Sequence, residues 1–172
     1  MQIDLVSRIG TRDEFYNTFR EGDEKRFFDG LPLIFYAAAN TNLEVRYEIC
    51  NFLLDRGVIV TALNKENQNI LHIVLGHAEQ DIPKTTSLCK RLIDKGVDIN
   101  NADKRKTVAL KSIIAMKYTD AELSPLYDLW FSQPFVDLSI HDKWGLTPIE
   151  FAKKFPYRNN AVERMMTYVF KQ

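Results

Sequence analysis

The sequence predicts an all-α protein built from about four consecutive helix-turn-helix units. A polar turn motif recurs along the chain, and its apolar anchor residues are spaced 38 to 39 residues apart, at Leu33, Leu71, Leu110 and Ile149. A second motif, in which a glycine follows a pair of aliphatic residues, keeps the same spacing. No segment shows the apolar–polar alternation of a β-strand. A repeat at this fixed period is typical of stacked helical units.

Length and composition fit one ordinary globular domain. The chain has 172 residues, of which 45% are hydrophobic and 27% are charged, and this argues against disorder. It contains 23 basic and 23 acidic residues. Because the net charge is about zero, a general electrostatic attraction to nucleic acid or to an anionic membrane is not expected.

Targeting signals and disulfides are not expected either. The longest apolar run, LPLIFYAAA at residues 31–39, is much shorter than the roughly 20 residues that span a bilayer. The first ten residues, MQIDLVSRIG, lack the apolar segment of a signal peptide. Two cysteines give no disulfide framework. We therefore expect a cytoplasmic protein with no membrane partner.

The turn motif defines the repeat boundaries. Its clearest copy is DKWGLTPIEFA (142–152), and its relatives are NKENQNILHIV (64–74), DKRKTVALKSI (103–113) and RFFDGLPLIFY (26–36). The glycine motif occurs as LLDRGVIV (53–60) and LIDKGVDIN (92–100), with a partial third copy at 136–139. The predicted repeats are therefore approximately residues 26–63, 64–102, 103–141 and 142–172.

Helix boundaries follow from capping signals. A Thr followed three residues later by Glu forms a capping box, and this pattern occurs at Thr11/Glu14, Thr41/Glu44, Thr119/Glu122 and Thr147/Glu150. Prolines fit the first position of a helix, which predicts helix starts at Pro32 and Pro148. A left-handed glycine commonly ends a helix, which predicts helix ends at Gly57 and Gly96.

The two ends of the stack need caps. At the start of the chain, residues 1–25 are expected to form an N-terminal capping helix over about residues 12 to 20, ended by Gly22, with Phe15 and Phe19 facing the repeat domain (26–172). In the last helix the expected inward face is a stripe of apolar residues, Val162, Met165, Met166 and Val169.

The repeated segments resemble a known family. TPIEFA at 147–152 resembles the T-P-L-H-x-A signature of ankyrin repeats, and GVDIN at 96–100 resembles their G-A-D-hydrophobic-N segment. The resemblance covers residues 26–172, and it is strongest in the last repeat and weakest in the first. It implies an ankyrin-repeat solenoid that binds proteins through its turn tips and inner helices.

The sequence also departs from this family's pattern. The spacing of 38 to 39 exceeds the usual ankyrin period of about 33, and we assign the excess to extended helix-to-helix connections at residues 77–85 and 117–125. The third repeat has Val108-Ala109 in place of Thr-Pro and Lys106 in place of Gly. HEAT-like repeats have a nearer period of about 40, but they lack the turn motif.

Cysteine and histidine offer limited chemistry. Cys50 and Cys89 occupy the same position in successive repeats, about 8 to 10 Å apart in stacked helices, which is beyond disulfide reach. We expect buried thiols. His72 occupies the His of the ankyrin signature, which implies a structural link between neighbouring turns. His72, His77 and His141 do not form a metal-binding pattern. No nucleotide-binding or hydrolase motif is present, so no catalysis, cofactor or metal is expected.

The resemblance places the partner-binding residues at the turn tips and on the inner helices. By position they are Lys65, Glu66, Gln68, His77, Lys104, Arg105, Thr107, Met116, Lys143, Trp144, Leu146, Lys154 and Phe155. In the first repeat only the region of Phe27 and Phe28 can be indicated, and both can instead be buried under the N-terminal helix. The extended connections are a second candidate surface.

Two features at the tips have competing explanations. Lys104, Arg105 and Lys106, with Lys111, form the densest basic patch, expected at one tip as a solvated surface or a contact for an acidic partner. Trp144 either braces the preceding tip, on the aliphatic part of Lys104 or Arg105, or is a binding hot spot.

The sequence thus predicts a monomeric, non-catalytic protein-interaction module that works as a stand-alone adaptor or inhibitor. One alternative is a nucleic-acid-associated regulator that uses the basic tip of the third repeat. The other alternative is an enzyme whose site is assembled across repeats.

Overall fold

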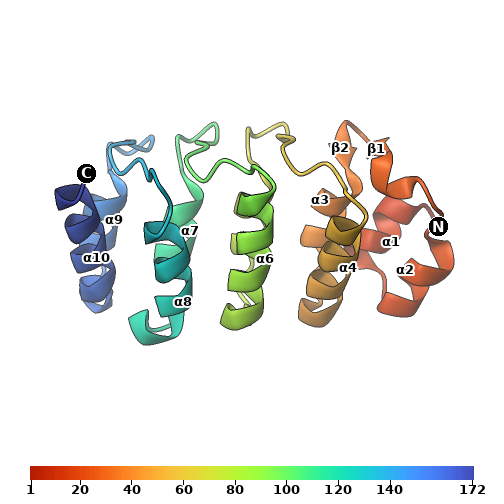
Figure 1. Ribbon diagram of the computed structural model, residues 1–172, viewed down its shortest axis with the longest axis horizontal. Coiled ribbons are helices and arrows are strands. Elements are labelled where there is room, and N and C mark those ends of the chain that lie inside the picture. Colours follow the sequence, from red (N-terminus) through yellow and green to blue (C-terminus); the bar gives the residue numbers. More distant parts are fainter.

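The computed structural model describes residues 1–172, and it is an all-α fold, as predicted. It contains ten α-helices, two short 3-10 helices and one two-stranded sheet. The helices follow one another in pairs, and the pairs stand side by side in a single row with the chain termini at opposite ends (Figure 1). The turns between pairs project along one edge of the row.

The first helix of each pair belongs to an inner layer and the second to an outer layer. The inner helices are α1 (Ile3–Ile9), α3 (Leu33–Ala38), α5 (Ile70–Leu75), α7 (Ala109–Ala115) and α9 (Pro148–Lys153). The outer helices are α2 (Arg12–Thr18), α4 (Leu43–Asp55), α6 (Ile82–Asp94), α8 (Asp120–Phe131) and α10 (Asn159–Phe170). The 3-10 helices are η1 (Asp23–Lys25) and η2 (Pro156–Arg158), and the strands are β1 (Phe27–Phe28) and β2 (Leu31–Pro32). Within each layer every helix contacts the one before and the one after it.

No helix combines the length and the apolar composition needed to cross a membrane.

One apolar core runs through the whole row. The predicted anchors Leu33, Leu71 and Leu110 are buried, whereas Ile149, the last of them, is only half-buried. The anchors of the earlier units are covered by the next helix pair, and Ile149 has no following pair. Burial of a continuous apolar face therefore depends on stacking, as it does in repeat architectures.

The turn motif adopts one conformation three times. In each copy the side-chain Oδ1 of the first residue accepts hydrogen bonds from the backbone N–H groups two and four residues later, for Asn64, Asp103 and Asp142. The fourth residue is left-handed in each, with φ of 60° at Asn67, 58° at Lys106 and 79° at Gly145. This identical geometry explains why the motif tolerates different sequences at the other positions.

Backbone hydrogen bonds join successive turns. Lys104 N–H donates to the Glu66 carbonyl, and Lys143 N–H donates to the Arg105 carbonyl, each at 3.0 Å. The three turns therefore form one continuous edge. The first turn differs, since it is a β-hairpin in which Asp29 and Gly30 have φ of 45° and 80°, the geometry of tight hairpin turns.

Phe27 is exposed and Phe28 is half-buried in this hairpin. The Arg26 guanidinium lies 4.8 Å from the ring centre of Phe28, and Tyr36 donates a hydrogen bond to the Phe28 carbonyl. Phe27 is thus available at the surface and is not buried under the N-terminal helices.

Most of the capping predictions are confirmed. Capping boxes form at Thr11, Thr119 and Thr147, and Gly57 and Gly96 are left-handed after the outer helices. Pro148 begins α9, whereas Pro32 lies one residue before α3.

The box predicted at Thr41 and Glu44 is wrong. The cap of α4 is Asn42, whose Oδ1 accepts the N–H of Val45 at 3.1 Å. Asn42 itself is held by Asn40, whose Oδ1 accepts the Asn42 N–H at 2.9 Å. The helix therefore starts one residue later than predicted.

The predicted extended connections are also wrong. α6 begins at Ile82 and α8 at Asp120, so only residues 76–81 and 116–119 link the helices. Pro83 lies in the first turn of α6, where a missing N–H is harmless, and Pro125 lies inside α8. Most of the expected loop residues belong to the outer helices.

The short connections are bonded to neighbouring units. Tyr118 donates to the Gln80 carbonyl and accepts the Gln80 N–H, at 3.0 and 2.9 Å. Arg158 is fully buried and donates to the carbonyls of Ile114, Met116 and Tyr118. Arg158 thereby satisfies carbonyls at the end of α7, which lack helical partners. The connections are structural joints between units.

The ends of the row differ from prediction in detail. The N-terminal cap has two helices, because α1 precedes the predicted helix, and buried Phe15 packs against Phe19 and Phe52. In α10 the buried residues are Ala161, Met165 and Tyr168. Of the expected stripe, Met165 is buried and Val162 is half-buried, whereas Met166 and Val169 are exposed.

Candidate functional site

The candidate site is the edge formed by the turns together with the exposed side of the inner helices. We call it the tip surface, and it comprises residues 64–68, 103–107 and 142–146, the outward-facing residues of α5, α7 and α9, and the residues that directly follow these helices. Seven of the predicted residues are exposed there: Lys65, Glu66, Lys104, Arg105, Lys143, Trp144 and Lys154. Five are partly exposed: Gln68, His77, Thr107, Leu146 and Phe155.

Met116 was also predicted to bind a partner, but this prediction is wrong because Met116 is buried and does not reach the surface. α7 ends at Ala115, and the exposed residue at this level is Ala115 itself. His77 is engaged in packing, since its Nε2 lies 2.7 Å from the carbonyl oxygen of Ala38 in the preceding unit. Burial lowers the pKa of His77. A neutral ring donating to the Ala38 carbonyl makes His77 a link between units.

Sequence reasoning missed three residues of the surface. Ile73, Ser112 and Phe151 are partly exposed on successive inner helices, and each follows an apolar anchor by two positions. In a helix such a residue is rotated by about 200° from the anchor and so points away from the core. The positions of the anchors therefore suffice to predict that these residues face outward.

The fourth unit carries an aromatic cluster. Phe151 and Phe155 pack edge to face with ring centres 5.2 Å apart, and Tyr157 follows at 5.6 Å from Phe155. Tyr157 is 62% exposed. Lys111 Nζ lies 5.5 Å from the Phe151 ring centre and also binds the adjacent turn, so the cluster continues toward the tip.

Trp144 is 65% exposed at the tip of the fourth turn. Its ring partner is the neighbouring Lys143, whose Nζ lies 4.4 Å from the ring centre, and not Lys104 or Arg105 of the preceding tip. The link between these two tips is the backbone bond from Lys143 to Arg105. The indole ring therefore makes no cation–π contact with the preceding tip and remains largely accessible.

Lys111 was predicted to belong to the basic tip of the third repeat, but this prediction is wrong because Lys111 is buried. Its Nζ donates to Asp142 Oδ2 at 2.7 Å and to the Leu146 carbonyl, and both charged side chains are 3% exposed. Burial would raise the pKa of Asp142, but hydrogen bonds from Lys111 and from the N–H groups of Leu146 and Trp144 lower it overall. The pair joins the third unit to the fourth turn.

His72 has the corresponding role one unit earlier. Its Nε2 lies 2.9 Å from the Thr107 carbonyl, and its Nδ1 lies 2.9 Å from Asn69 Oδ1. This is the link between neighbouring turns that the resemblance implied for His72. Lys111 thus replaces an imidazole with an ammonium group at the equivalent joint.

Charge is unevenly distributed along the tips. Lys65 of the second turn lies 3.5 Å from Asp29, and Lys104 of the third turn lies 4.0 Å from Glu66, so these two cations have acidic neighbours. Arg105, Lys106, Lys143 and Lys154 are exposed and form no ion pair. The third and fourth turns therefore carry a local positive excess on a chain without net charge.

The cysteines are buried and free. Burial raises the pKa of Cys50 to about 12 and raises that of Cys89 as well, so both are neutral packing groups. His141 is exposed, and no three His, Cys, Asp or Glu side chains come together as a metal site.

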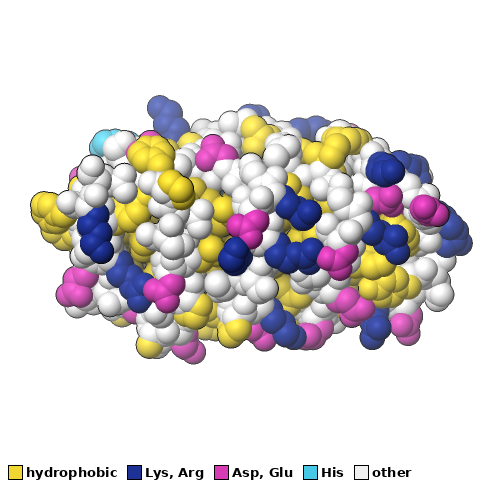
Figure 2. All heavy atoms as spheres, viewed as in Figure 1, with side chains coloured by type: hydrophobic (Ala, Val, Ile, Leu, Met, Phe, Trp, Pro, Cys, Tyr) yellow, Lys and Arg dark blue, Asp and Glu magenta, His cyan; other side chains and the backbone are white.

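The outer face has a different character. Acidic and basic side chains are interspersed over it (Figure 2), and ion pairs connect neighbouring helices, such as Lys84 with Glu44 and Arg91 with Asp55, each at 2.6 Å. Charged side chains of the outer face therefore pair with one another, whereas Arg105, Lys106, Lys143 and Lys154 of the tip surface form no ion pair.

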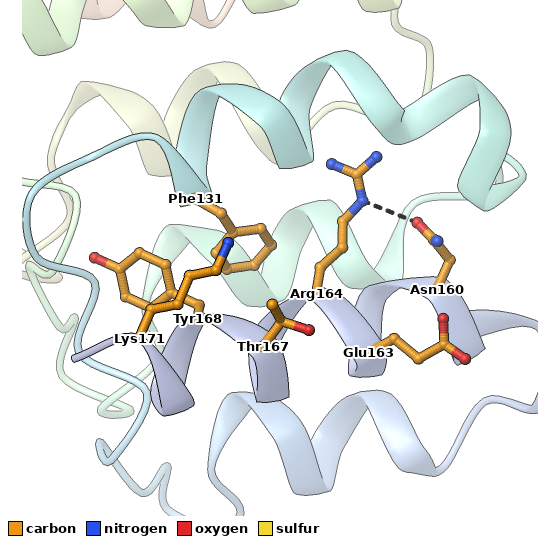
Figure 3. Close-up of a pocket in the computed structure, with 7 residues that line it drawn as sticks. All are labelled: Phe131, Asn160, Glu163, Arg164, Thr167, Tyr168 and Lys171. Carbon is orange, nitrogen blue, oxygen red and sulfur yellow. Dashed lines mark hydrogen bonds between the residues drawn. The ribbon is translucent and has the colours of Figure 1, made fainter.

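A shallow pocket of about 310 Å³ lies between α8 and α10 on the outer face (Figure 3). Arg164 donates to Asn160 there at 3.0 Å and also contacts Asp128 and Ser124. Its guanidinium is thus used in joining α10 to α8. The lining does not bring together buried titratable groups, so the tip surface remains the stronger candidate.

Comparison with solved structures shows a similar fold in a protein of known structure. No family model matches the chain, and no curated protein matches it. Among solved structures it is similar to the crystal structure of a functionally unknown protein from Leptotrichia buccalis C-1013-b, with 31% sequence identity and a TM-score of 0.85. The match covers 99% of this chain and 93% of that chain. The chain therefore belongs to the same family as this Leptotrichia buccalis protein.

Proposed function

We propose that the protein is an ankyrin-repeat protein with four repeats in residues 26–172 and an N-terminal cap in residues 1–25. Three features support this assignment. The turns share one hydrogen-bonded geometry and are joined edge to edge, TPIEFA begins α9 with a capping box, and left-handed glycines follow two outer helices. The period of 38 to 39 is a variation within this architecture.

We further propose that it is a non-catalytic protein-binding module, which acts as an adaptor or inhibitor through the tip surface. The observation that carries this function is the exposed Trp144, which is 65% accessible, has Lys143 over its ring and belongs to the same unit as the aromatic cluster. Accessible aromatics within a polar rim are the composition of binding hot spots. The buried core beneath holds them rigidly, which lowers the entropic cost of association.

Affinity capture of partners from cell extract tests this function. The intact chain is compared with Trp144→Ala and with Lys104→Glu/Arg105→Glu, each checked for a native circular dichroism spectrum. Phe170→Ala and Lys90→Glu are matched controls, because Phe170 and Lys90 are exposed away from the tips. We expect the tip variants to reduce capture about tenfold or more and the controls to leave it unchanged. Full capture by both folded tip variants would exclude this surface.

The basic third tip supports nucleic-acid binding as a second candidate. Arg105 and Lys106 have no acidic partner there, but Glu66 lies 4.0 Å from Lys104 and adds negative charge along the same edge. Steeply salt-dependent retention on heparin or DNA, lost in Lys104→Glu/Arg105→Glu, would favour this candidate over protein binding.

A further inference from the structure

We propose that the tip surface binds an acidic peptide segment with apolar anchor side chains, and that this segment lies across the third and fourth turns and onto α9. The inference rests on the proposed protein-binding function and specifies the chemistry of the partner. It follows from the uneven charge of the tips, from the aromatic cluster and from the engagement of Asp103 and Asp142, the acidic side chains of these two turns, in contacts within the fold.

The cations supply the electrostatic part of the site. Arg105, Lys106 and Lys143 are exposed on adjacent turns that are tied together by the Lys143–Arg105 backbone bond, and none has an ion-pair partner within the chain. Lys154 adds a fourth free cation on the inner-helix side. Of the two acidic side chains in these turns, Asp142 is buried and bound to Lys111, and Asp103 is half-buried and accepts the backbone N–H groups of Arg105 and Thr107. A partner must therefore provide the negative charge.

The aromatic cluster supplies the apolar part. Tyr157 is exposed at one end of the cluster and Phe151 and Phe155 are half-buried, while Trp144 is exposed on the turn that precedes α9. The neighbouring positions on α7 are the small residues Ser112 and Ala115. Aliphatic or aromatic side chains of a partner can thus pack against the aromatic cluster and over the small residues of α7. The free cations of the third and fourth turns belong to the same surface.

The geometry favours an acidic peptide over single-stranded nucleic acid. Nucleic-acid grooves offer open aromatic faces on which successive bases stack. Here Phe151 and Phe155 turn edge to face against each other at 79°, and Lys143 lies over the Trp144 ring. Phosphates that continued along the tips would meet Glu66 and Asp29, whereas a short peptide confined to the last two turns would not.

Selection from a displayed library of random peptides of about 16 residues, enough to span several turns, tests the inference. The full chain is the bait, and Arg105→Glu/Lys143→Glu is the counter-bait. Lys154→Glu is a second variant that retains both turns, and Lys90→Glu is the matched control on the outer face. Affinities of enriched peptides and of a labelled oligothymidylate of similar length are then measured by fluorescence anisotropy at low and high salt.

The inference predicts enriched peptides that are rich in Asp and Glu with interspersed apolar residues. Their affinity should fall about tenfold in each folded cation variant, stay unchanged in Lys90→Glu, and weaken at high salt. Enrichment of neutral or basic peptides whose binding depends on Trp144 would overturn the inference but leave the proposed function standing. Tighter binding of oligothymidylate than of any peptide would overturn the inference in favour of nucleic acid. Absence of any tip-dependent peptide or oligonucleotide would overturn both.

Discussion

Lys106 occupies a backbone position that glycine fits better. Its φ is 58°, and the equivalent residue of the fourth turn, Gly145, has φ of 79°. A side chain in this region costs about 1 to 2 kcal/mol, partly offset by the higher unfolded-state entropy of glycine. We predict that Lys106→Gly is more stable than Lys106→Ala by about 0.5 to 1 kcal/mol in urea unfolding.

Gly145→Ala is the reciprocal test. A Cβ at this position would meet no atom within 4 Å, so any loss of stability comes from the backbone alone. We expect a loss of about 1 kcal/mol. Equal stabilities of Lys106→Gly and Lys106→Ala would show that the third turn relaxes without strain.

The buried pair of Lys111 and Asp142 should give the stability a component that depends on pH. The pKa of Asp142 is lowered in the folded protein. Its contribution is therefore fully present above the unfolded-state pKa of about 3.9 and is lost as the pH falls through the lower folded pKa. Asp142→Asn preserves the turn geometry, as Asn64 does in the second turn, but leaves Lys111 without a counterion.

We predict that Asp142→Asn costs about 3 to 5 kcal/mol at neutral pH and that its difference from the wild type shrinks as the pH falls below about 4. Lys111→Met/Asp142→Asn should recover much of this loss, because it leaves no unpaired buried charge. Urea unfolding over a pH series measures both effects. A difference independent of pH would show that packing, and not the charge, holds this joint.

For a single residue, the sequence predicts burial or exposure well when the adjacent residues decide it. Trp144 is the third residue of a hydrogen-bonded turn, so its place at a tip could be predicted. Lys111 could not, because its burial depends on Asp142, which is 31 residues away in the chain. A lysine close to three other basic residues is more often solvated than buried.

Asn42, and not Thr41, caps α4, and this assignment can be tested directly. Removing a side-chain cap costs about 1 kcal/mol. We predict that Asn42→Ala lowers the free energy of unfolding by about this amount, while Thr41→Ala changes it little. Thr147→Ala, which removes the capping box of α9, is the positive control. A larger effect at Thr41 than at Asn42 would contradict the observed helix start.

Helix boundaries were predicted correctly where a local capping pattern marks them in the sequence. The three confirmed boxes are local, so the sequence suffices for the starts of α2, α8 and α9. The first helix was missed because its cap residue, Gln2, makes no side-chain hydrogen bond. The connections were predicted too long because the excess of the repeat spacing over about 33 residues was assigned to two segments, which contain Pro83 and Pro125. Both prolines are tolerated in helices, Pro83 in the first turn and Pro125 at an exposed position.

The row of helix pairs could be predicted because two sequence motifs recur at one fixed spacing. The faces at the two ends could not, since burial there depends on which neighbour is present. Met166 and Val169 were expected inside, but α10 has no outer helix following it, and its buried residues are those that face α8 and α9. The inner-helix residues of the tip surface could be predicted only from the register of the buried anchors, and the unpaired charges required the structure.

Because the helices of each layer contact their successive neighbours, a substitution should destabilise its own unit most and distant units least. Met165 in α10 and Leu92 in α6 are both fully buried, and truncating either to Ala should cost about 2 to 5 kcal/mol. We predict that Met165→Ala accelerates amide hydrogen exchange mainly in α9 and α10 and leaves α3 to α6 protected. Leu92→Ala should reduce protection on both sides of the central unit. Mass spectrometry of peptide fragments resolves these regions. Uniform loss of protection in Met165→Ala would instead show that the row unfolds as one cooperative unit.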